Sequence, residues 1–302
     1  MIFGYRTLIL NNNLRKIKIS VFEIIKLSRF FINTTVRTAF VIFKLSLILP
    51  ILTFGVFISV ILKIVLFFSN KWLYIKINTK YVLRPILRIL LFVIGVKVTR
   101  PKDITISNAI IVSNHWGYLD SLLLMAFFPS MVISNVDVKQ MPFVGKIMTM
   151  MGFVFVNRQN NNSIPVIIEK SAEIINNTDL SIAFFPEGGT GDGFKIRRFK
   201  SSFFELAFTA KKNVIPVVIR IEAINKETPN HDNINQVVFH SSQENILKHL
   251  LKLLQLKSIE ISATVLPQIS YYEIHSKYLS RKKICEIAEK EISDFIDKNQ
   301  RC

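Results

Sequence analysis

The sequence has only two cysteines among its 302 residues, Cys285 and Cys302. Two thiols cannot build a disulfide framework or a cysteine-rich zinc site, which excludes a small scaffold of either kind. Ten glycines and ten prolines are too few for a collagen-like or low-complexity chain. Half of the residues are hydrophobic, 25 are phenylalanine, and the mean hydropathy is +0.36. This composition excludes a largely disordered chain and indicates a protein associated with a membrane.

Acidic side chains are almost absent from the first third of the chain. Residues 1–102 contain 17 lysines and arginines and a single acid, Glu23, whereas the other 200 residues contain 22 basic and 20 acidic side chains. Nearly all of the net charge of +18 therefore lies in the first third. A nucleic-acid enzyme would carry its positive charge around its binding site, but here the charge accompanies a strongly apolar segment. We predict a bilayer with anionic headgroups as partner, and no nucleic acid.

The longest apolar run, residues 45–62, lies between Lys44 and Lys63. A helix between these lysines would measure about 28 Å at ~1.5 Å per residue, close to the roughly 30 Å of a hydrocarbon core. A second apolar run, residues 86–96, is too short to span and predicts an interfacial helix. Because basic residues flank the first run on both sides, the pattern fits a spanning helix or a monotopic hairpin kinked at Pro50. A helix buried in a soluble core is the third interpretation.

Residues 103–302 have a different texture, in which short apolar runs alternate with helical patterns. The alternation predicts an α/β fold whose mixed, largely parallel central sheet is flanked by helices and preceded by an N-terminal helical membrane anchor, residues 1–102. Strands are expected at 109–112, 131–134, 153–156, 181–185, 214–219 and 259–266. Helices are expected at 121–128, 164–175, 202–212 and, as a closing amphipathic helix, 279–298.

The segment SNHWGYLD, residues 113–120, joins an expected strand to an expected helix. His115 and Asp120 could not face each other on one helix, but a turn at Gly117 would let the carboxylate reach the imidazole. Such a contact fixes the tautomer of the ring and suits it to act as a general base on a substrate hydroxyl. The simpler alternative is that Asp120 only caps the helix and that His115 is an ordinary loop residue.

A glycine-rich loop follows the expected strand at 181–185. Glu187 is followed by four glycines within residues 188–193, and then by the cations Lys195, Arg197, Arg198 and Lys200. Backbone N–H groups of such a loop can approach a phosphate or an oxyanion. Arg158 ends another expected strand, where its guanidinium could bind a phosphate or carboxylate. Either feature alone is common on protein surfaces. The remaining histidines are scattered without ligand spacing, so we expect no metal site.

Four segments in order resemble the sequence blocks of the glycerolipid acyltransferases, which include 1-acyl-glycerol-3-phosphate acyltransferase. NHWGYLD (114–120) resembles the NH-x4-D block, and GFVFVNR (152–158) resembles the G-x-x-F-x-x-R block. FPEGG (185–189) resembles F-P-E-G-T, and VIPVVI (214–219) resembles the apolar-Pro-apolar block. Together they cover about residues 110–220.

This resemblance implies transfer of a fatty acyl group from acyl-CoA or acyl carrier protein to the free hydroxyl of a lysolipid, with no cofactor. His115 would be the general base and Asp120 its orienting partner. The acceptor would be bound by Arg158, Glu187, Gly188, Gly189, Thr190 and Lys200. Residues 103–302 would form the catalytic domain, on the cytoplasmic side of an inner or cytoplasmic membrane.

The third block departs from the family pattern. Gly188 is followed by Gly189, Thr190 and GDG, and no arginine stands where the block often has one. The leading hypothesis is acylation of 1-acyl-glycerol-3-phosphate to phosphatidic acid. Another lysolipid, such as lyso-ornithine lipid or a lysophospholipid, remains an alternative acceptor, and a non-catalytic lipid-binding membrane protein is a further alternative.

Overall fold

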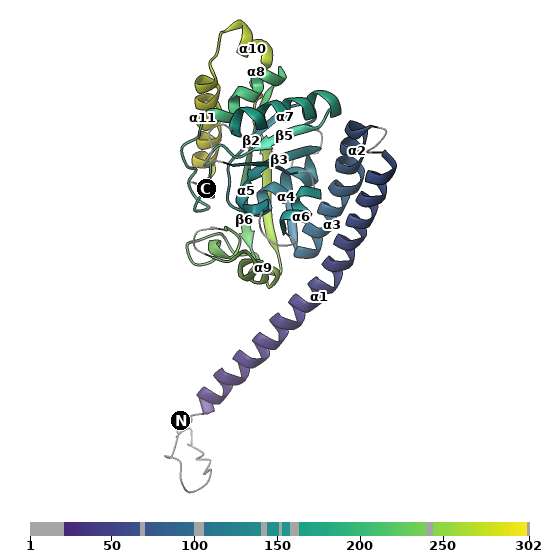
Figure 1. The fold of residues 1–302 in the computed structure, drawn as a ribbon. Helices are drawn as coiled ribbons and strands as arrows, with labels where there is room; N and C mark the ends of the chain where they lie inside the picture. The colour runs from purple at the N-terminus through teal and green to yellow at the C-terminus, as the bar shows by residue number, and fades with distance from the viewer. Residues whose placement is uncertain are drawn as a thin grey trace.

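The computed structural model describes residues 21–66, 70–99, 106–139, 144–150, 153–157, 163–239 and 244–300. Within these ranges the chain folds around one sheet, with a long helix running along one side of the molecule (Figure 1). The predicted α/β class, with a largely parallel sheet flanked by helices, is confirmed.

The described strands form a seven-stranded sheet in the order β1-β7-β6-β2-β5-β3-β4. All neighbouring pairs are parallel except β6 and β7, which are antiparallel. The central strands β2 and β5 are buried along their whole length, which explains why they are continuous apolar runs in the sequence. The strands are β1 (Val96–Thr99), β2 (Ile110–Ser113), β3 (Ser130–Asn135), β4 (Val154–Val156), β5 (Ser181–Phe184), β6 (Val214–Ile224) and β7 (Ile259–Val265).

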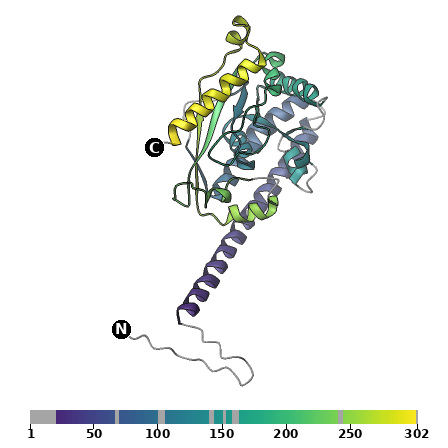
Figure 2. The same cartoon turned by 90° about the vertical axis from the view of Figure 1, so that its left-hand side faces the viewer.

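Helices cover both faces of this sheet. The β2–β3 connection contains α4 and runs in the opposite direction along the sheet from the β4–β5 connection through α7, so right-handed crossovers place α4 and α7 on opposite faces. In Figure 2, α11 lies in front of the strands and α1 passes behind them. The helices of the α/β part are α4 (Tyr118–Phe127), α5 (Val136–Lys139), α6 (Val144–Met150), α7 (Ser163–Thr178), η2 (Ser202–Glu205), α8 (Leu206–Ala210), η3 (Ile234–Gln236), α9 (Ile246–Leu254), α10 (Tyr271–Ser276) and α11 (Arg281–Gln300).

The N-terminal segment forms helices that lie beside the sheet. Helix α1 (Val21–Leu66) continues through Pro50 without a break, and the chain then returns alongside it through α2 (Lys71–Ile77), η1 (Asn78–Leu83) and α3 (Arg84–Ile94). The reversal of direction therefore follows Leu66, and the structure shows no hairpin turn at Pro50. Residues 34–66 of α1 are long and apolar enough to cross a membrane, as the sequence predicted.

The segment assigned to the anchor also contributes to the sheet. Helix α3 buries Leu87, Leu91 and Ile94 and packs against α4, while Ile89 and Phe92 stay exposed. Gly95 ends α3 in a left-handed conformation (φ 99°), and β1 starts at the next residue and pairs with β7. The predicted division at residue 102 stays a prediction, but one strand of the sheet lies before it.

Lys44, expected to flank the apolar run at the membrane surface, is buried instead. Its ammonium group donates hydrogen bonds to the carbonyl oxygens of Ile94 (2.5 Å) and Leu256 (2.8 Å). Ile94 is the last residue of α3 and Leu256 lies two residues after α9 ends, and unpaired carbonyls at such C-terminal ends attract a cation. Lys44 therefore joins three helices.

Candidate active site

The turn between β2 and α4 brings His115 and Asp120 together, as their spacing predicted. His115 Nδ1 lies 3.0 Å from Asp120 Oδ2. The same oxygen accepts hydrogen bonds from the backbone N–H groups of Trp116 (2.5 Å) and Gly117 (2.8 Å). Asp120 therefore caps α4 and contacts the imidazole through one carboxylate oxygen, and the role of His115 as a general base stays a prediction.

The His115 ring is partly exposed and contacts Asp120 through only one of its two nitrogens. The ring stacks on Phe185 with centroids 4.0 Å apart and planes 13° from parallel, and its side chain is 19% exposed. Among the residues that the structure describes, none hydrogen-bonds to Nε2. The Asp120 carboxylate favours the tautomer of His115 that carries its proton on Nδ1. In this tautomer Nε2 has no proton and is the basic nitrogen of the ring.

Residues on both sides of His115 are bonded to β6, the strand next to β2. The side-chain amide of Asn114 donates to Ile219 O and accepts from Ile219 N, each at 2.8 Å. The indole N–H of Trp116 also donates to Ile219 O at 2.8 Å. Asn114, Trp116 and Ile219 are all buried, so these hydrogen bonds hold the backbone of the turn rigidly. Asn114 was not among the predicted site residues, although its place beside His115 in the first block was the available signal.

Glu187 lies beneath the same turn and joins it to the glycine loop. Its Oε1 accepts a hydrogen bond from His115 N and its Oε2 accepts one from Arg197 N, both at 2.7 Å. The residue is only 4% exposed. Burial raises the pKa of the Glu187 carboxyl to about 7, against the opposing effect of these two hydrogen bonds. Both oxygens are thus used within the protein, and its predicted contact with the acceptor stays a prediction.

The glycine loop lets two cations approach its backbone. Gly188 has a φ of 73°, and a Cβ atom there would lie 3.0 Å from Lys200 Nζ. A Cβ atom on Gly189 would lie 2.7 Å from Arg197 Nη1. Lys200 was a predicted site residue, whereas the sequence grouped Arg197 with three other cations and did not single it out. Arg197 therefore brings a guanidinium to the loop although the third block lacks its arginine.

Other contacts complete the loop. The N–H of Gly191 donates to His115 O at 2.7 Å, which ties the loop to the His115 turn a second time. Thr190 lies between these glycines and is partly exposed. Arg158 lies outside the described residues, shortly after β4 ends at Val156, so its part in the site stays a prediction. Over the described ranges, no three His, Cys, Asp or Glu side chains gather in a way that could hold a metal ion.

Comparison with known proteins assigns a class to this site. Residues 95–220 match the family model described as Acyltransferase, a range that contains the His115 turn, the glycine loop and Pro216. The predicted resemblance to the glycerolipid acyltransferases is thereby confirmed over this range.

Several proteins of similar sequence are named 1-acyl-sn-glycerol-3-phosphate acyltransferases. That of Neisseria gonorrhoeae is 31% identical over 127 residues, covering 42% of this chain and 49% of the relative. That of Borreliella burgdorferi is 30% identical over 45% of this chain and 56% of the relative. That of Escherichia coli K12 is 25% identical over 68% of this chain and 78% of the relative. The chain thus spans about half the length of the first two relatives.

A solved structure shares the fold. The 1-acyl-sn-glycerophosphate acyltransferase PlsC from Thermotoga maritima superposes with a TM-score of 0.50, covering 85% of this chain and 98% of that one. The two sequences are 16% identical, so the likeness concerns the fold alone.

Proposed function

We propose that the protein is a membrane-bound O-acyltransferase that moves a fatty acyl group from an acyl thioester to the free hydroxyl of a lysolipid. The acceptor is 1-acyl-glycerol-3-phosphate and the product is phosphatidic acid. One observation carries this proposal: the His115–Asp120 pair leaves Nε2 available beside a glycine loop approached by Arg197 and Lys200. The names of the relatives point to the same acceptor.

In this reaction His115 Nε2 takes the proton of the acceptor hydroxyl as the hydroxyl oxygen attacks the thioester carbonyl carbon. The resulting tetrahedral intermediate then collapses, and the carbon–sulfur bond breaks. The proton on Nε2 passes to the leaving thiolate, which restores neutral His115. Asp120 keeps Nδ1 protonated and stabilises the imidazolium that forms between the two steps. The thioester is activated already, so no nucleophilic side chain is required.

The phosphate of the acceptor binds beside the glycine loop. The side chains of Arg197 and Lys200 are exposed there, and neither pairs with a carboxylate among the described residues. A guanidinium and an ammonium at adjacent backbone positions suit a dianionic phosphate monoester. Arg158, the arginine of the second sequence block, is proposed as a further cation for this phosphate. Glu187 connects the phosphate loop to the turn of the base, so it positions both.

The acceptor reaches this site from the bilayer, which holds the chain through α1. The catalytic part lies on the cytoplasmic side of an inner or cytoplasmic membrane, where acyl-CoA or acyl carrier protein is available. The departure of the third block, with Gly189 and Thr190 after Gly188, favours as second candidate an acceptor such as lyso-ornithine lipid or a lysophospholipid.

An acceptor panel tests the proposal. The purified full-length chain is incubated with radiolabelled acyl-CoA or acyl carrier protein and, in turn, lysophosphatidate, lysophosphatidylglycerol, lysophosphatidylcholine and lyso-ornithine lipid. Labelled phosphatidic acid as the main product is the expected result. A different labelled product identifies the second candidate, and no product with any acceptor while the protein still binds lysolipid indicates the non-catalytic alternative.

A further inference from the structure

Helix α9 carries an exposed apolar stripe that the α/β fold leaves uncovered. Leu247 is 60% exposed and Leu251 is 46% exposed, one helical turn apart on the same side. The exposed Lys248 and Lys252 lie beside them. The opposite side of the helix is buried through His249, Leu253 and Leu254. An amphipathic helix with leucines and lysines toward the outside is suited to the interface of an anionic bilayer.

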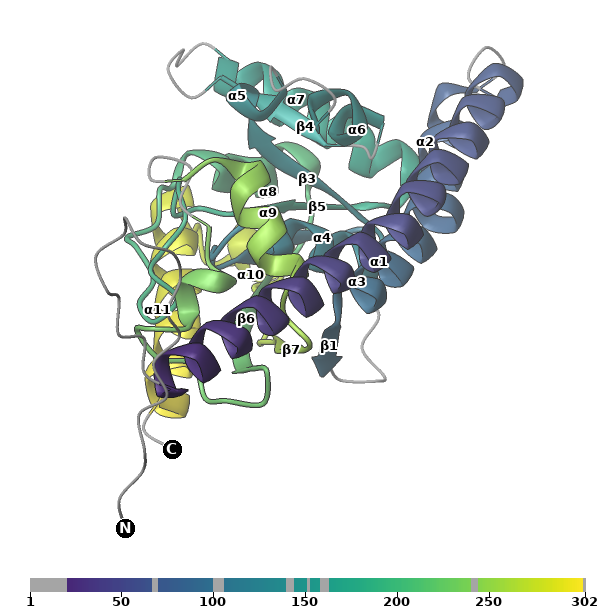
Figure 3. The same cartoon turned by 90° about the horizontal axis from the view of Figure 1, so that it is seen from below.

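The position of α9 places this stripe next to the predicted membrane helix. Helices α1 and α9 pack against each other and lie side by side in Figures 1 and 3. Lys44 on α1 fixes the contact by donating to the carbonyl of Leu256, two residues after α9 ends. The exposed side of α9 therefore belongs to a helix that packs directly against α1.

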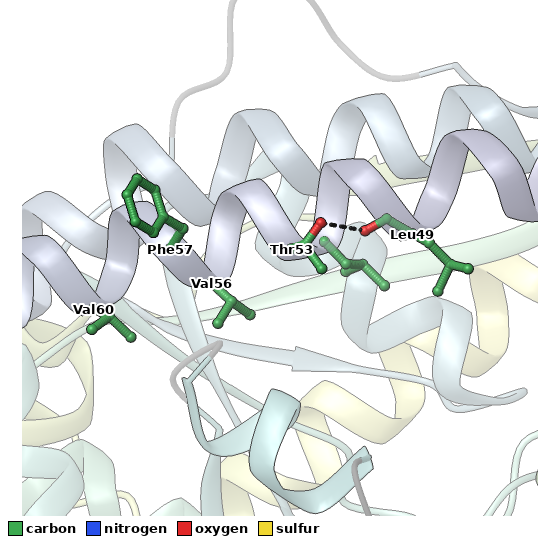
Figure 4. Close-up of a pocket in the computed structure, with 6 residues that line it drawn as sticks. Leu49, Thr53, Val56, Phe57 and Val60 are labelled. Carbon is green, nitrogen blue, oxygen red and sulfur yellow. Dashed lines mark hydrogen bonds between the residues drawn. The ribbon is translucent and has the colours of Figure 1, made fainter.

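Helix α1 itself exposes apolar side chains over several turns. Many of its large hydrophobic side chains are exposed, among them Phe54, Phe57 and Ile64. An open hollow of about 430 Å³ runs along the helix (Figure 4). Its lining is almost wholly apolar and consists of Leu49, Leu52, Thr53, Val56, Phe57 and Val60.

From the packing of α9 against α1 and the exposed apolar side chains of both helices, we propose that α9 is a second membrane-contacting element, which inserts Leu247 and Leu251 into the headgroup interface of the bilayer that holds α1. Lys248 contacts the phosphates of anionic lipids beside the leucines, while Lys252, on the same side of the helix, pairs with Glu244 at 2.5 Å. The proposal rests on the membrane-bound part of the proposed function and adds a contact from outside residues 1–102, where the anchor was predicted.

The buried side of α9 connects this contact to the catalytic turn. His249 Nδ1 lies 3.0 Å from the hydroxyl of Tyr118, the first residue of α4, and His249 Nε2 lies 3.0 Å from Val238 O. The next backbone N–H, that of Phe239, donates to Trp116 O at 3.0 Å. A bilayer contact on the outer side of α9 therefore holds the membrane surface at a fixed position relative to the His115 turn.

A fluorescent label distinguishes this contact from that of α1. Single cysteines at Leu251→Cys, Phe57→Cys and Val166→Cys are introduced into the full-length chain with Cys302→Ser, leaving the buried Cys285 in place. Each is labelled with an environment-sensitive nitrobenzoxadiazole probe, and the parent without a new cysteine controls for labelling elsewhere. Val166 on α7 is 65% exposed and serves as the matched apolar control. The proteins are reconstituted in vesicles of phosphatidylcholine, with or without phosphatidylglycerol.

The proposal predicts that the probes at 251 and 57 shift to the blue and are quenched by doxyl-labelled lipid, whereas the probe at 166 is unaffected. Lys248→Glu should reduce the quenching at 251 in the phosphatidylglycerol vesicles, and Lys170→Glu on α7 should not. A probe at 251 that behaves like that at 166, while the probe at 57 is quenched, overturns the contact by α9 and leaves α1 as the anchor.

Two other outcomes also overturn it. Absence of quenching at both 57 and 251 contradicts the membrane-bound part of the proposed function along with this contact. A blue shift at 251 that rises with protein concentration and is insensitive to doxyl lipid would show that a second copy of the chain covers α9.

Discussion

His115 and Asp120 are joined by the same turn that starts helix α4. The Nδ1 and Oδ2 atoms lie 3.0 Å apart, and Oδ2 also accepts the N–H groups of Trp116 and Gly117. One carboxylate oxygen thus fixes the orientation of the ring and the first turn of the helix. A change at Asp120 is therefore expected to affect catalysis and local stability together.

Asp120→Asn should lower kcat strongly. The side-chain amide of asparagine can direct an N–H group, where Asp120 has an oxygen acceptor, at His115 and at the backbone N–H groups of the turn. The tautomer of the ring is then no longer fixed, and the loss of the cap should cost about 1 kcal/mol of unfolding free energy. Steady-state kinetics and thermal unfolding of the detergent-solubilised chain measure the two effects. Asp297→Asn, exposed on α11, is the control. Unchanged kcat would show that Asp120 only caps the helix.

Glu187 should make the stability of the protein depend on pH. Its pKa in the folded chain is about 7, above the ordinary 4.5, so the folded state keeps a proton that the unfolded chain releases between these values. The contribution to stability is complete below about pH 4.5 and is lost as the pH rises to about 7. Its size is about 3 kcal/mol at most.

Glu187→Gln removes this titration. Chemical unfolding of the wild type and the variant is followed between pH 4.5 and 8. The difference between their unfolding free energies should change up to about pH 7 and approach a constant value above it. Parallel curves would contradict the raised pKa. Because both carboxylate oxygens accept backbone N–H groups, the variant should also lower kcat more than it raises the KM for the acceptor, as expected for a positioning residue.

Arg197→Ala and Lys200→Ala should weaken the binding of a phosphate-bearing acceptor. A charge-assisted hydrogen bond contributes about 1.5–3 kcal/mol, so the KM for lysophosphatidate should rise about tenfold or more. The KM for the acyl donor should change little. Arg198→Ala, the neighbouring exposed cation, is the matched control, and Arg158→Ala in the same assay tests the arginine predicted from the second block. If Arg197→Ala and Arg198→Ala raised the KM for lysophosphatidate equally, the proposed phosphate site at the glycine loop would be contradicted.

The anchor should resist extraction by salt. Residues 34–66 of α1 are held by burial in hydrocarbon, which salt does not screen, whereas the contacts of exposed cations with headgroups weaken at high ionic strength. Membranes containing the full-length chain, washed with high salt or carbonate, should keep the protein in the pellet until detergent is added. Recovery of the protein in the salt wash would leave only a peripheral basic surface.

Much of the fold was predictable because buried parallel strands are apolar throughout. All six expected strands are present among the described residues, and β6 continues to Ile224 beyond the expected end. Strand β1 was not predicted, because its four residues follow an apolar helix directly and resemble its continuation. The closing helix was predicted from its period and runs from Arg281 to Gln300.

The site was predictable where its residues lie near each other in the sequence. The contact of His115 with Asp120 follows from a turn of a few residues, which spacing can indicate. The contacts of Lys44 with Ile94 and Leu256, and of Arg197 with Gly189, depend on how separate elements pack or how a loop folds back. A cation in the sequence does not reveal which backbone it will reach, so Lys44 was expected at the membrane surface and Arg197 was not singled out.

Turnover of His115→Ala tests the central claim most directly. The variant is compared with wild type in acyl transfer from labelled acyl thioester to lysophosphatidate, with circular dichroism and membrane fractionation confirming an unchanged fold and location. Loss of the general base should lower kcat about 10²–10⁴-fold. A variant that is folded, membrane-bound and retains more than half of the wild-type turnover would contradict the assignment of His115 as the base.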